Sequence, residues 1–245
     1  TLTSILVDSF IRYAPIIIGF ILLSIVSVVV QTSWFKGLFG ELKVRRLIRS
    51  HLNQEQYHPF HNVMLVTPDG TTQIDHIIIS KFGLFVLETK NMKGWIFGSS
   101  KQSNWTQQIY KRKYRFQNPL RQNYKHEKAL EAALNVSAEL IYSVIIFVGD
   151  SSFKTPMPES VVNRRSFVRF IKSKTETFFD DNEVEALVQK LAVNKLESTR
   201  QVKRDHVQRL QSRNNPNSTQ LCPKCGGTMV IRTARKGKNA GEQFW

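Results

Sequence analysis

Cysteine and acidic residues are both scarce in this sequence of 245 residues. Only two cysteines are present, so the chain cannot be a secreted fold held together by several disulfides. The 19 Asp and Glu residues are outnumbered by 35 Lys and Arg residues, which gives a formal net charge of +16. This excess of positive charge favours an acidic partner, and nucleic acid and anionic lipid are the leading candidates.

Glycine-rich phosphate-binding loops and internal repeats are also absent from the sequence. Hydrophobic residues make up 41% of the chain and charged residues 22%, which excludes a wholly disordered or fibrous protein. At roughly 100–200 residues per domain, the length is sufficient for one full domain with smaller attachments.

The N-terminal part of the chain lacks charge over the 23 residues between Arg12 and Lys36. A helix of this length reaches about 35 Å, and the hydrocarbon core of a bilayer is ~30 Å thick. The apolar segment of a signal peptide is shorter, at roughly 7–15 residues, and a small-residue cleavage site follows it. Here the bulky residues Trp34 and Phe35 follow. We therefore expect a transmembrane anchor over residues 1–35, rather than a signal peptide or a buried core helix.

Positive charge gathers directly after this apolar segment. The basic residues are Lys36, Lys43, Arg45, Arg46 and Arg49. The positive-inside rule then predicts a single-pass protein of the inner or plasma membrane whose C-terminal part is cytoplasmic. Free thiols at Cys222 and Cys225 fit that reducing compartment.

The residues after the anchor predict an α/β fold with helices on both faces of a mixed sheet. Helical periodicity predicts an amphipathic helix over 36–52, and Pro119 is placed to open a helix that reaches about Ala138. Further helices are predicted near 167–171, from Asp180 or Asp181 to about Leu196, and over 198–213. Strands are predicted over 62–67, 72–79, 83–89, 95–97, 107–116, 141–148 and 161–163.

The stretch over 71–91 brings two acids and a lysine together in a predicted hairpin. With the turn centred on 81–82, paired residue numbers sum to 163, and Asp75 faces Glu88. Because side chains alternate along a strand, Asp75, Glu88 and Lys90 share one face among apolar neighbours. Directly opposed Cβ atoms lie ~4.5–5.5 Å apart, where two ionised carboxylates repel each other unless a cation lies between them.

A divalent cation would remove this repulsion, and Mg²⁺ or Mn²⁺ prefers carboxylate oxygens. Such an ion polarises a phosphoryl oxygen and lowers the pKa of water, while Lys90 would orient or deprotonate that water or stabilise a pentacovalent phosphate. The alternative is a strand-end salt bridge between Lys90 and one of the acids, because acid-x-Lys is a common tripeptide. A bulge between the strands would break the register.

At these residues the chain resembles the nuclease-related domain (NERD) family, a branch of the PD-(D/E)xK nuclease superfamily. The matching pieces are Gly40-Glu41, Gln73-Ile74-Asp75-His76, Gly83 to Asn91, Gly94 to Gly98, Trp105-Thr106-Gln107 and Asn118 to Asn123. The resemblance implies a restriction-endonuclease-like αβββαβ core in which Asp75 and Glu88 hold a divalent metal and Lys90 is the catalytic lysine. It also implies that Glu41 is a helix carboxylate facing the site and that Gln107 is a supporting polar residue.

Some of these polar residues also have structural interpretations. Glu41 would balance the basic helix around it, and Gln107 would serve the fold rather than the chemistry. His76 points to the opposite face of its strand, and we interpret it as a packed core histidine rather than a ligand.

Residues 101–128 hold eight Lys and Arg residues and one acid. If 109–116 is one strand, Lys111, Lys113 and Arg115 line one of its faces, and aromatic residues line the other. A charged stripe beside a metal site suits a phosphate backbone and gives affinity without sequence preference. The alternative is a solvated edge strand that is protected by its charge. The predicted DNA-binding residues are Lys111, Arg112, Lys113, Arg115, Arg121 and Lys125.

A single Cys-x-x-Cys motif lies near the C-terminus, at Cys222 and Cys225. With the strand-like and aromatic segments that follow, it resembles the first half of a topoisomerase-type DNA-binding zinc ribbon. A structural zinc ion needs four ligands, so we expect the full-length protein to continue beyond Trp245 and to bind Zn²⁺ if it supplies two more. A thioredoxin-like role is disfavoured because no βαβ pattern precedes the motif.

The sequence therefore predicts five segments. They are a transmembrane anchor over 1–35, a nuclease-related domain over 36–165, a helical extension over 166–213, a linker over 214–220 and a partial zinc ribbon over 221–245. The predicted function is a membrane-anchored, divalent-metal-dependent nuclease that hydrolyses DNA phosphodiester bonds. The alternatives are a non-catalytic, membrane-tethered DNA-binding protein with a nuclease-like fold, and a membrane-surface protein whose charge meets anionic lipid.

Overall fold

The computed structural model describes residues 2–68 and 70–196, followed by short pieces at 204, 208, 220–221, 228–230, 232–233 and 243–244. The short pieces include two antiparallel strand pairs. They are β10 (Gln220–Leu221) with β11 (Thr228–Met229), and β12 (Arg232–Thr233) with β13 (Gln243–Phe244). Both cysteines, and nearly all of the predicted helix over 198–213 and of the linker, lie outside the described residues.

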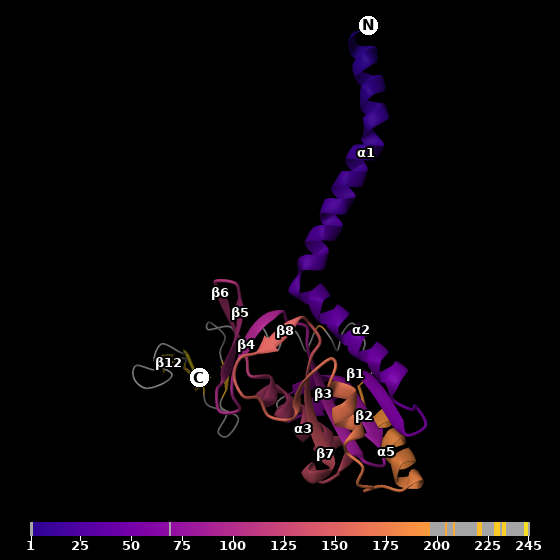
Figure 1. Ribbon diagram of the computed structural model, residues 1–245, viewed down its shortest axis with the longest axis vertical. Helices are drawn as coiled ribbons and strands as arrows, with labels where there is room; N and C mark the ends of the chain where they lie inside the picture. The colour runs from indigo at the N-terminus through magenta and orange to yellow at the C-terminus, as the bar shows by residue number, and fades with distance from the viewer. Residues whose placement is uncertain are drawn as a thin grey trace.

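Two helices precede the sheet. Helix α1 (Leu2–Gln31) extends away from the rest of the molecule (Figure 1), and its large apolar side chains between Ile17 and Val30 are exposed. Helix α2 (Ser33–His51) begins after Thr32, whose side-chain oxygen accepts a hydrogen bond from the Phe35 N–H. Among the helices that the structure describes, none is long and apolar enough by itself to cross a membrane. The segments over 17–31 and 34–51, bent by 70°, pass the same test of length and composition only together.

The core is a five-stranded mixed sheet with the strand order β1-β2-β3-β7-β9. Its strands are β1 (Tyr57–Thr67), β2 (Gly70–Ser80), β3 (Gly83–Lys90), β7 (Ile141–Phe147) and β9 (Val161–Asn163). The pairs β1–β2 and β2–β3 are antiparallel, whereas the pairs β3–β7 and β7–β9 are parallel. The predicted hairpin register is confirmed, because Ser80 pairs with Gly83 and Ile77 with Val86.

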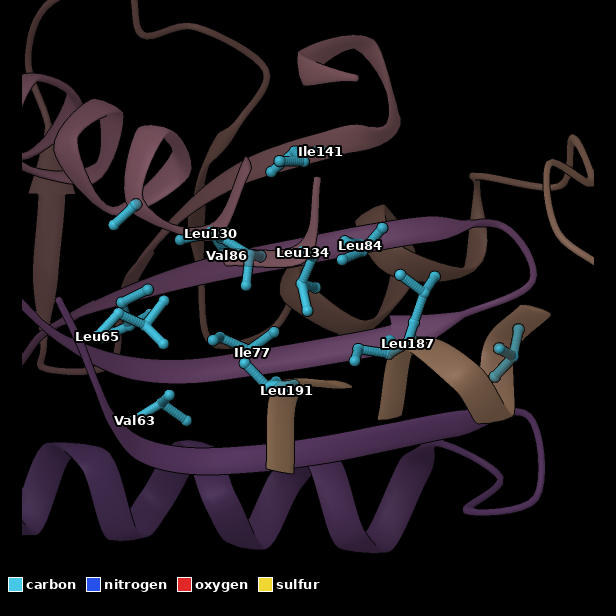
Figure 2. Packing of buried hydrophobic residues seen from close by; sticks show 14 residues of the cluster. Val63, Leu65, Ile77, Leu84, Val86, Leu130, Leu134, Ile141, Leu187 and Leu191 are labelled. Carbon is cyan, nitrogen blue, oxygen red and sulfur yellow. The ribbon is translucent and has the colours of Figure 1, made fainter. Parts of the chain in front are cut away.

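Helices cover both faces of this sheet, as predicted. On one face lie α3 (Pro119–Leu134) and α5 (Asp181–Asn194), and on the other lie α2 and α4 (Phe167–Lys172). Figure 2 shows side chains of the apolar layer between the sheet and helices α3 and α5. Its labelled members are Val63, Leu65, Ile77, Leu84, Val86, Leu130, Leu134, Ile141, Leu187 and Leu191. Each buried Leu or Ile contributes about 1.5–3 kcal/mol, so the two apolar layers hold the strands in place.

Local signals set the ends of these helices. Asn118 caps α3 by accepting from the Leu120 N–H, and Pro119 occupies the first helical turn. The predicted end near Ala138 was wrong, because Asn135 adopts a left-handed conformation with φ of 52° and stops α3 at Leu134. A short 3-10 helix, η1 (Ala138–Leu140), then leads into β7. Asp180 begins α5 through a capping box with Glu183.

A second, four-stranded sheet packs beside the first in the order β6-β5-β4-β8. Its strands are β4 (Gly94–Phe97), β5 (Asn104–Ile109), β6 (Arg112–Gln117) and β8 (Ser151–Phe153). The single strand predicted over 107–116 was wrong, since Tyr110 has φ of 52° and divides it into a hairpin. Trp105 is fully buried and stacks on Phe147 of the main sheet, which joins the two sheets.

Gly40 of α2 crosses the end of β3 at very short range. A Cβ at this position would lie 2.7 Å from the Asn91 Cβ and 3.4 Å from carbons of Thr89 and Val148. Asn91 is held against the same helix, because its Nδ2 donates to the Lys36 carbonyl at 2.7 Å. A residue without a side chain is therefore required where α2 meets β3.

We expect Gly40→Ala to destabilise the domain by roughly 1–3 kcal/mol, because crowding at Asn91 outweighs the ~1 kcal/mol gain in helix propensity. Gly37→Ala is the matched control, since an added Cβ there meets nothing within 4 Å. The control is expected to stabilise by up to about 1 kcal/mol. Urea unfolding midpoints measure both effects, and equal stabilisation by the two substitutions would contradict the close approach.

Two histidines face each other across β1 and β2. The Nδ1 atoms of His61 and His76 lie 2.8 Å apart, and His76 is only 1% exposed. Burial, with Arg45 beside it, lowers the pKa of His61 to about 4. Burial, His61 and Arg45 lower the pKa of His76 to about 3. His76 is thus a packed residue of the sheet.

Stability is therefore expected to fall as the pH drops from about 6.5 toward 4, since the unfolded chain then binds protons that the folded chain excludes. Each histidine contributes a slope of at most ~1.4 kcal/mol per pH unit. Urea unfolding at several pH values should give a flatter profile for a His61→Gln, His76→Leu double variant. His51→Gln, in an exposed part of α2, is the control. An unchanged slope in the double variant would rule this pair out as the source.

Candidate functional site

At Asp75 the pairing of β2 with β3 has ended, and its pairing with β1 is interrupted for one position. The β2–β3 ladder reaches His76 paired with Leu87, and the β1–β2 ladder skips the position where Asn62, with φ of 53°, would face Asp75. The Asp75 carboxylate instead accepts a hydrogen bond from the Thr89 backbone N–H at 2.8 Å. Its side chain thus replaces a main-chain partner at the open end of the hairpin.

The interruption at Asp75 also changes the face of the sheet on which Ile74 lies. Strict alternation places Ile74 opposite Ile77, but both residues pack in the same apolar cluster. The alternation fails because the regular pairing of β2 is interrupted at Asp75.

Glu88 and Lys90 are held together on β3. The Lys90 Nζ donates to Glu88 Oε1 at 2.7 Å and to Gln122 Oε1 of α3 at 3.0 Å. On the other side, His126 Nε2 lies 3.3 Å from Glu88 Oε2, and His126 Nδ1 lies 2.9 Å from Thr72 Oγ1. The predicted alternative, an ion pair between Lys90 and one acid, is therefore part of the site.

The two carboxyl groups have opposite electrostatic environments. Burial raises the pKa of Asp75, the charges of Glu88 and Glu41 raise it further, and the Thr89 N–H and Lys90 offset only part of this. Burial also opposes ionisation of Glu88, but contacts with His126 and Lys90 outweigh it and lower the pKa of this carboxyl. Glu88 is thus the stabilised anion, and Asp75 carries the uncompensated repulsion.

The structure places the two supporting residues differently. Glu41 is half-buried on α2, close enough for its charge to raise the pKa of Asp75. Gln107 lies on β5 of the second sheet, and its Nε2 donates to the Lys93 carbonyl at 2.8 Å. Glu41 therefore joins the acidic group, whereas Gln107 supports the segment between β3 and β4.

Sequence reasoning assigned no role at the site to His126, and it noted Gln122 only within a motif. Both lie on α3, four residues apart, and so share one helix face. Asn123 between them is fully buried and donates to the Val86 carbonyl and to Ser143 Oγ. Polar residues on the buried face of an amphipathic helix were the signal that could have identified this contribution.

Part of this arrangement fits a hard divalent cation. Within residues 2–68, 70–196 and the short C-terminal pieces, no three His, Cys, Asp or Glu side chains form a ready-made metal cluster. Glu88 Oε2, however, is buried without a well-oriented hydrogen bond, and Asp75 lies in a field of negative charge. A cation between these two carboxylates would give Glu88 Oε2 a partner and would reduce the electrostatic repulsion at Asp75.

All six predicted DNA-binding residues are exposed. Lys113 and Arg115 share one face of β6, as predicted, whereas Lys111 lies in the turn of the β5–β6 hairpin rather than on that face. Arg112 begins β6, and Arg121 Nη2 donates to the Lys101 carbonyl at 3.0 Å. The hairpin stands at the edge of the molecule (Figure 1), so its charges are accessible to a large partner.

A cleft of about 420 Å³ lies near the carboxyl ends of the parallel strands β7 and β9. Lys43 of α2 lines it, together with Arg164 and Arg165 after β9. Positive charge is therefore present on the α2 side of the sheet as well as on the α3 side.

Asp75→Asn is expected to raise the free energy of unfolding by roughly 1–2 kcal/mol at pH 7, because the amide oxygen still accepts from Thr89 while the repulsion from Glu88 and Glu41 is lost. Asp75→Ala is the control, and we expect it to cost about 1–3 kcal/mol by leaving the Thr89 N–H unpaired. Urea unfolding in EDTA distinguishes them. Equal losses in both variants would show that the Asp75 charge is not destabilising.

Comparison with known proteins agrees with this geometry. Residues 36–148 match the family model of the nuclease-related domain. The chain is also 53% identical, over 98 residues, to an uncharacterized protein of Bacillus anthracis. That match covers 40% of this chain and 46% of the relative, so the chain spans about half of the relative's length. No solved structure matches the chain. The segment that contains Asp75, Glu88, Lys90 and α3 therefore lies within the part of the chain that is similar to the nuclease-related domain.

Proposed function

We propose that this protein is a divalent-metal-dependent nuclease that hydrolyses DNA phosphodiester bonds at Asp75, Glu88 and Lys90. The observation that carries the proposal is the pair of desolvated carboxylates at the open end of the β2–β3 hairpin, with a lysine bonded to one of them. This combination supplies ligands for a cation and a positive group for a phosphate within one small volume.

Asp75 and Glu88 would hold the divalent ion, Mg²⁺ or Mn²⁺, with Glu41 nearby. When bound, such an ion supplies a Lewis acid that polarises the phosphoryl oxygen and favours ionisation of water. In the hydrolysis, the oxygen of a water molecule bonds to phosphorus, one P–O ester bond breaks, and the leaving oxygen takes up a proton. The chain must therefore position a water, stabilise negative charge on the phosphate and exclude competing geometries.

Lys90 would stabilise negative charge on the phosphate. Its Nζ is fixed by Glu88 and Gln122, so it can donate to a phosphate oxygen with little loss of side-chain freedom. His126 Nε2 lies 3.3 Å from the second oxygen of Glu88, and His126 Nδ1 lies within hydrogen-bond distance of Thr72 Oγ1. Gln122 and His126 are thus positioning residues that act through Lys90 and Glu88.

The exposed basic residues of the β5–β6 hairpin and of α3 would bind the DNA backbone. Lys and Arg contacts to phosphate give affinity that falls steeply with salt and carries no sequence preference. The same residues also support the second candidate function, a DNA-binding protein without catalysis, since phosphate binding requires no metal cluster.

The membrane anchor is a separate part of the proposal. Between Ile17 and Val30, α1 exposes large apolar side chains along its length, and exposed apolar surface of this extent marks a contact with membrane or protein. Basic residues of α2 follow directly. We propose that this segment holds the domain at the cytoplasmic face of the inner or plasma membrane.

In a cleavage assay with plasmid and oligonucleotide DNA, the wild-type chain in detergent is expected to cut DNA in Mg²⁺ or Mn²⁺ and not in EDTA. Asp75→Ala and Lys90→Ala are expected to lose at least about 100-fold in rate, because each removes a group that acts on the reacting phosphate. Lys154→Ala, in a lysine outside the site, is the control. Wild-type binding without cleavage would favour the non-catalytic candidate, and unchanged cleavage in both site variants would refute the site assignment.

Magnesium should also raise the thermal unfolding midpoint of the wild type, because binding to the folded state alone stabilises it by about 2.7 kcal/mol at 100 times Kd. The Asp75→Ala variant is expected to lose most of this shift. A shift of the same size in both proteins would place the ion elsewhere.

A further inference from the structure

A groove of about 490 Å³ lies directly beside the proposed catalytic residues. One wall comes from the β1–β2 hairpin and the other from α3, and Gln117 at the end of β6 contributes a third side. Two of its lining residues contact the site directly, since Gln122 binds Lys90 and His126 lies against Glu88. A third, Thr72, contacts His126. The groove is therefore separated from Lys90 and Glu88 by one layer of side chains, those of Gln122 and His126.

The lining of the groove combines four kinds of surface. Apolar surface comes from Val66, which is 62% exposed, and from small residues of α3. An aromatic ring is available at Tyr124, which is 57% exposed. Side-chain amides come from three glutamines, and positive charge comes from Lys125 and from Lys128, whose Nζ is paired with Glu131 and lies 5.7 Å from the centroid of the Tyr124 ring. Asp and Glu are absent from the lining residues that the structure describes.

The aromatic, amide and positively charged surfaces each match one part of a nucleotide. A base presents a flat face that stacks on an aromatic ring, polar edges that pair with amides, and a phosphate that pairs with lysine. A paired base within a duplex has both faces covered by its neighbours, so its face cannot contact Tyr124 unless it leaves the stack. The groove thus suits an unpaired nucleotide better than a double helix.

We infer that this groove binds an unpaired base of single-stranded nucleic acid, stacked on Tyr124, with the adjoining phosphate directed toward Lys90. The inference rests on the proposed function for the position of the phosphate, and it adds the substrate class, a single strand or a frayed end. Lys125 and Lys128 would contact the backbone on either side of the base.

The test measures binding alone, with the full chain in detergent and EDTA, by fluorescence anisotropy of a labelled 12-nucleotide DNA strand. An abasic strand of equal length carries the same phosphates without bases, so the ratio of the two Kd values isolates the contribution of the bases. We expect the normal strand to bind roughly tenfold more tightly than the abasic strand, as stacking of a base on an aromatic side chain provides. The Kd for a 12-base-pair duplex is expected to be unaffected by Tyr124→Ala, because paired bases cannot stack on the ring.

Tyr124→Ala should reduce the ratio to about one while leaving the Kd for the abasic strand unchanged, and Tyr124→Phe, which keeps the ring, should preserve the ratio. Tyr114→Ala is the matched control, because Tyr114 is also exposed, at 47%, but does not line the groove. An unchanged ratio in Tyr124→Ala, or equal binding of normal and abasic strands by the wild type, would overturn the inference. If the ratio depends on Tyr124 but the chain does not cleave DNA, base binding in the groove is supported and the proposed nuclease activity is refuted.

Discussion

The repulsion between two desolvated carboxylates is the constraint on which the arrangement of this domain depends. Asp75 and Glu88 are brought together by the register of one hairpin, and burial makes their like charges more costly than they would be in water. The structure responds at each group separately. Asp75 accepts a hydrogen bond from a β3 backbone N–H where the β2–β3 ladder has ended, and Glu88 contacts Lys90 and His126. The open end of the hairpin is thus a consequence of where the charge is placed.

Two helices reach this point from opposite faces of the sheet, and each depends on a local feature of its own sequence. On one side, Gly40 allows α2 to touch the end of β3, which places Glu41 near Asp75. On the other side, Asn123 fixes α3 to the Val86 carbonyl, so that the residues flanking it face Lys90 and Glu88. The site therefore has one acidic side and one side rich in hydrogen-bond donors and amides.

The features that could be predicted from the sequence are those that depend on residues close together in the chain. The β2–β3 register follows from alternation and a two-residue turn, so the juxtaposition of Asp75 and Glu88 was accessible from the residues alone. The contacts of Lys90 with Gln122 and of Glu88 with His126 join residues more than 30 positions apart, and no local periodicity encodes them. The β5–β6 hairpin was missed because its turn rests on a left-handed tyrosine, Tyr110, where glycine or asparagine is the usual signal.

The energetics of the site bear on the choice between an enzyme and a binding module. Replacing a buried group of charges by apolar residues of similar volume is often neutral or stabilising by about 1–4 kcal/mol. A sheet that served only to present a basic surface would therefore gain from Ile or Val where Asp75 and Glu88 stand, and its DNA affinity would rise as two negative charges disappeared. The chain instead places both acids, a lysine and a histidine in one network. Such a network opposes phosphate binding unless a cation joins it, and this is the physical reason for proposing metal-dependent hydrolysis rather than binding alone.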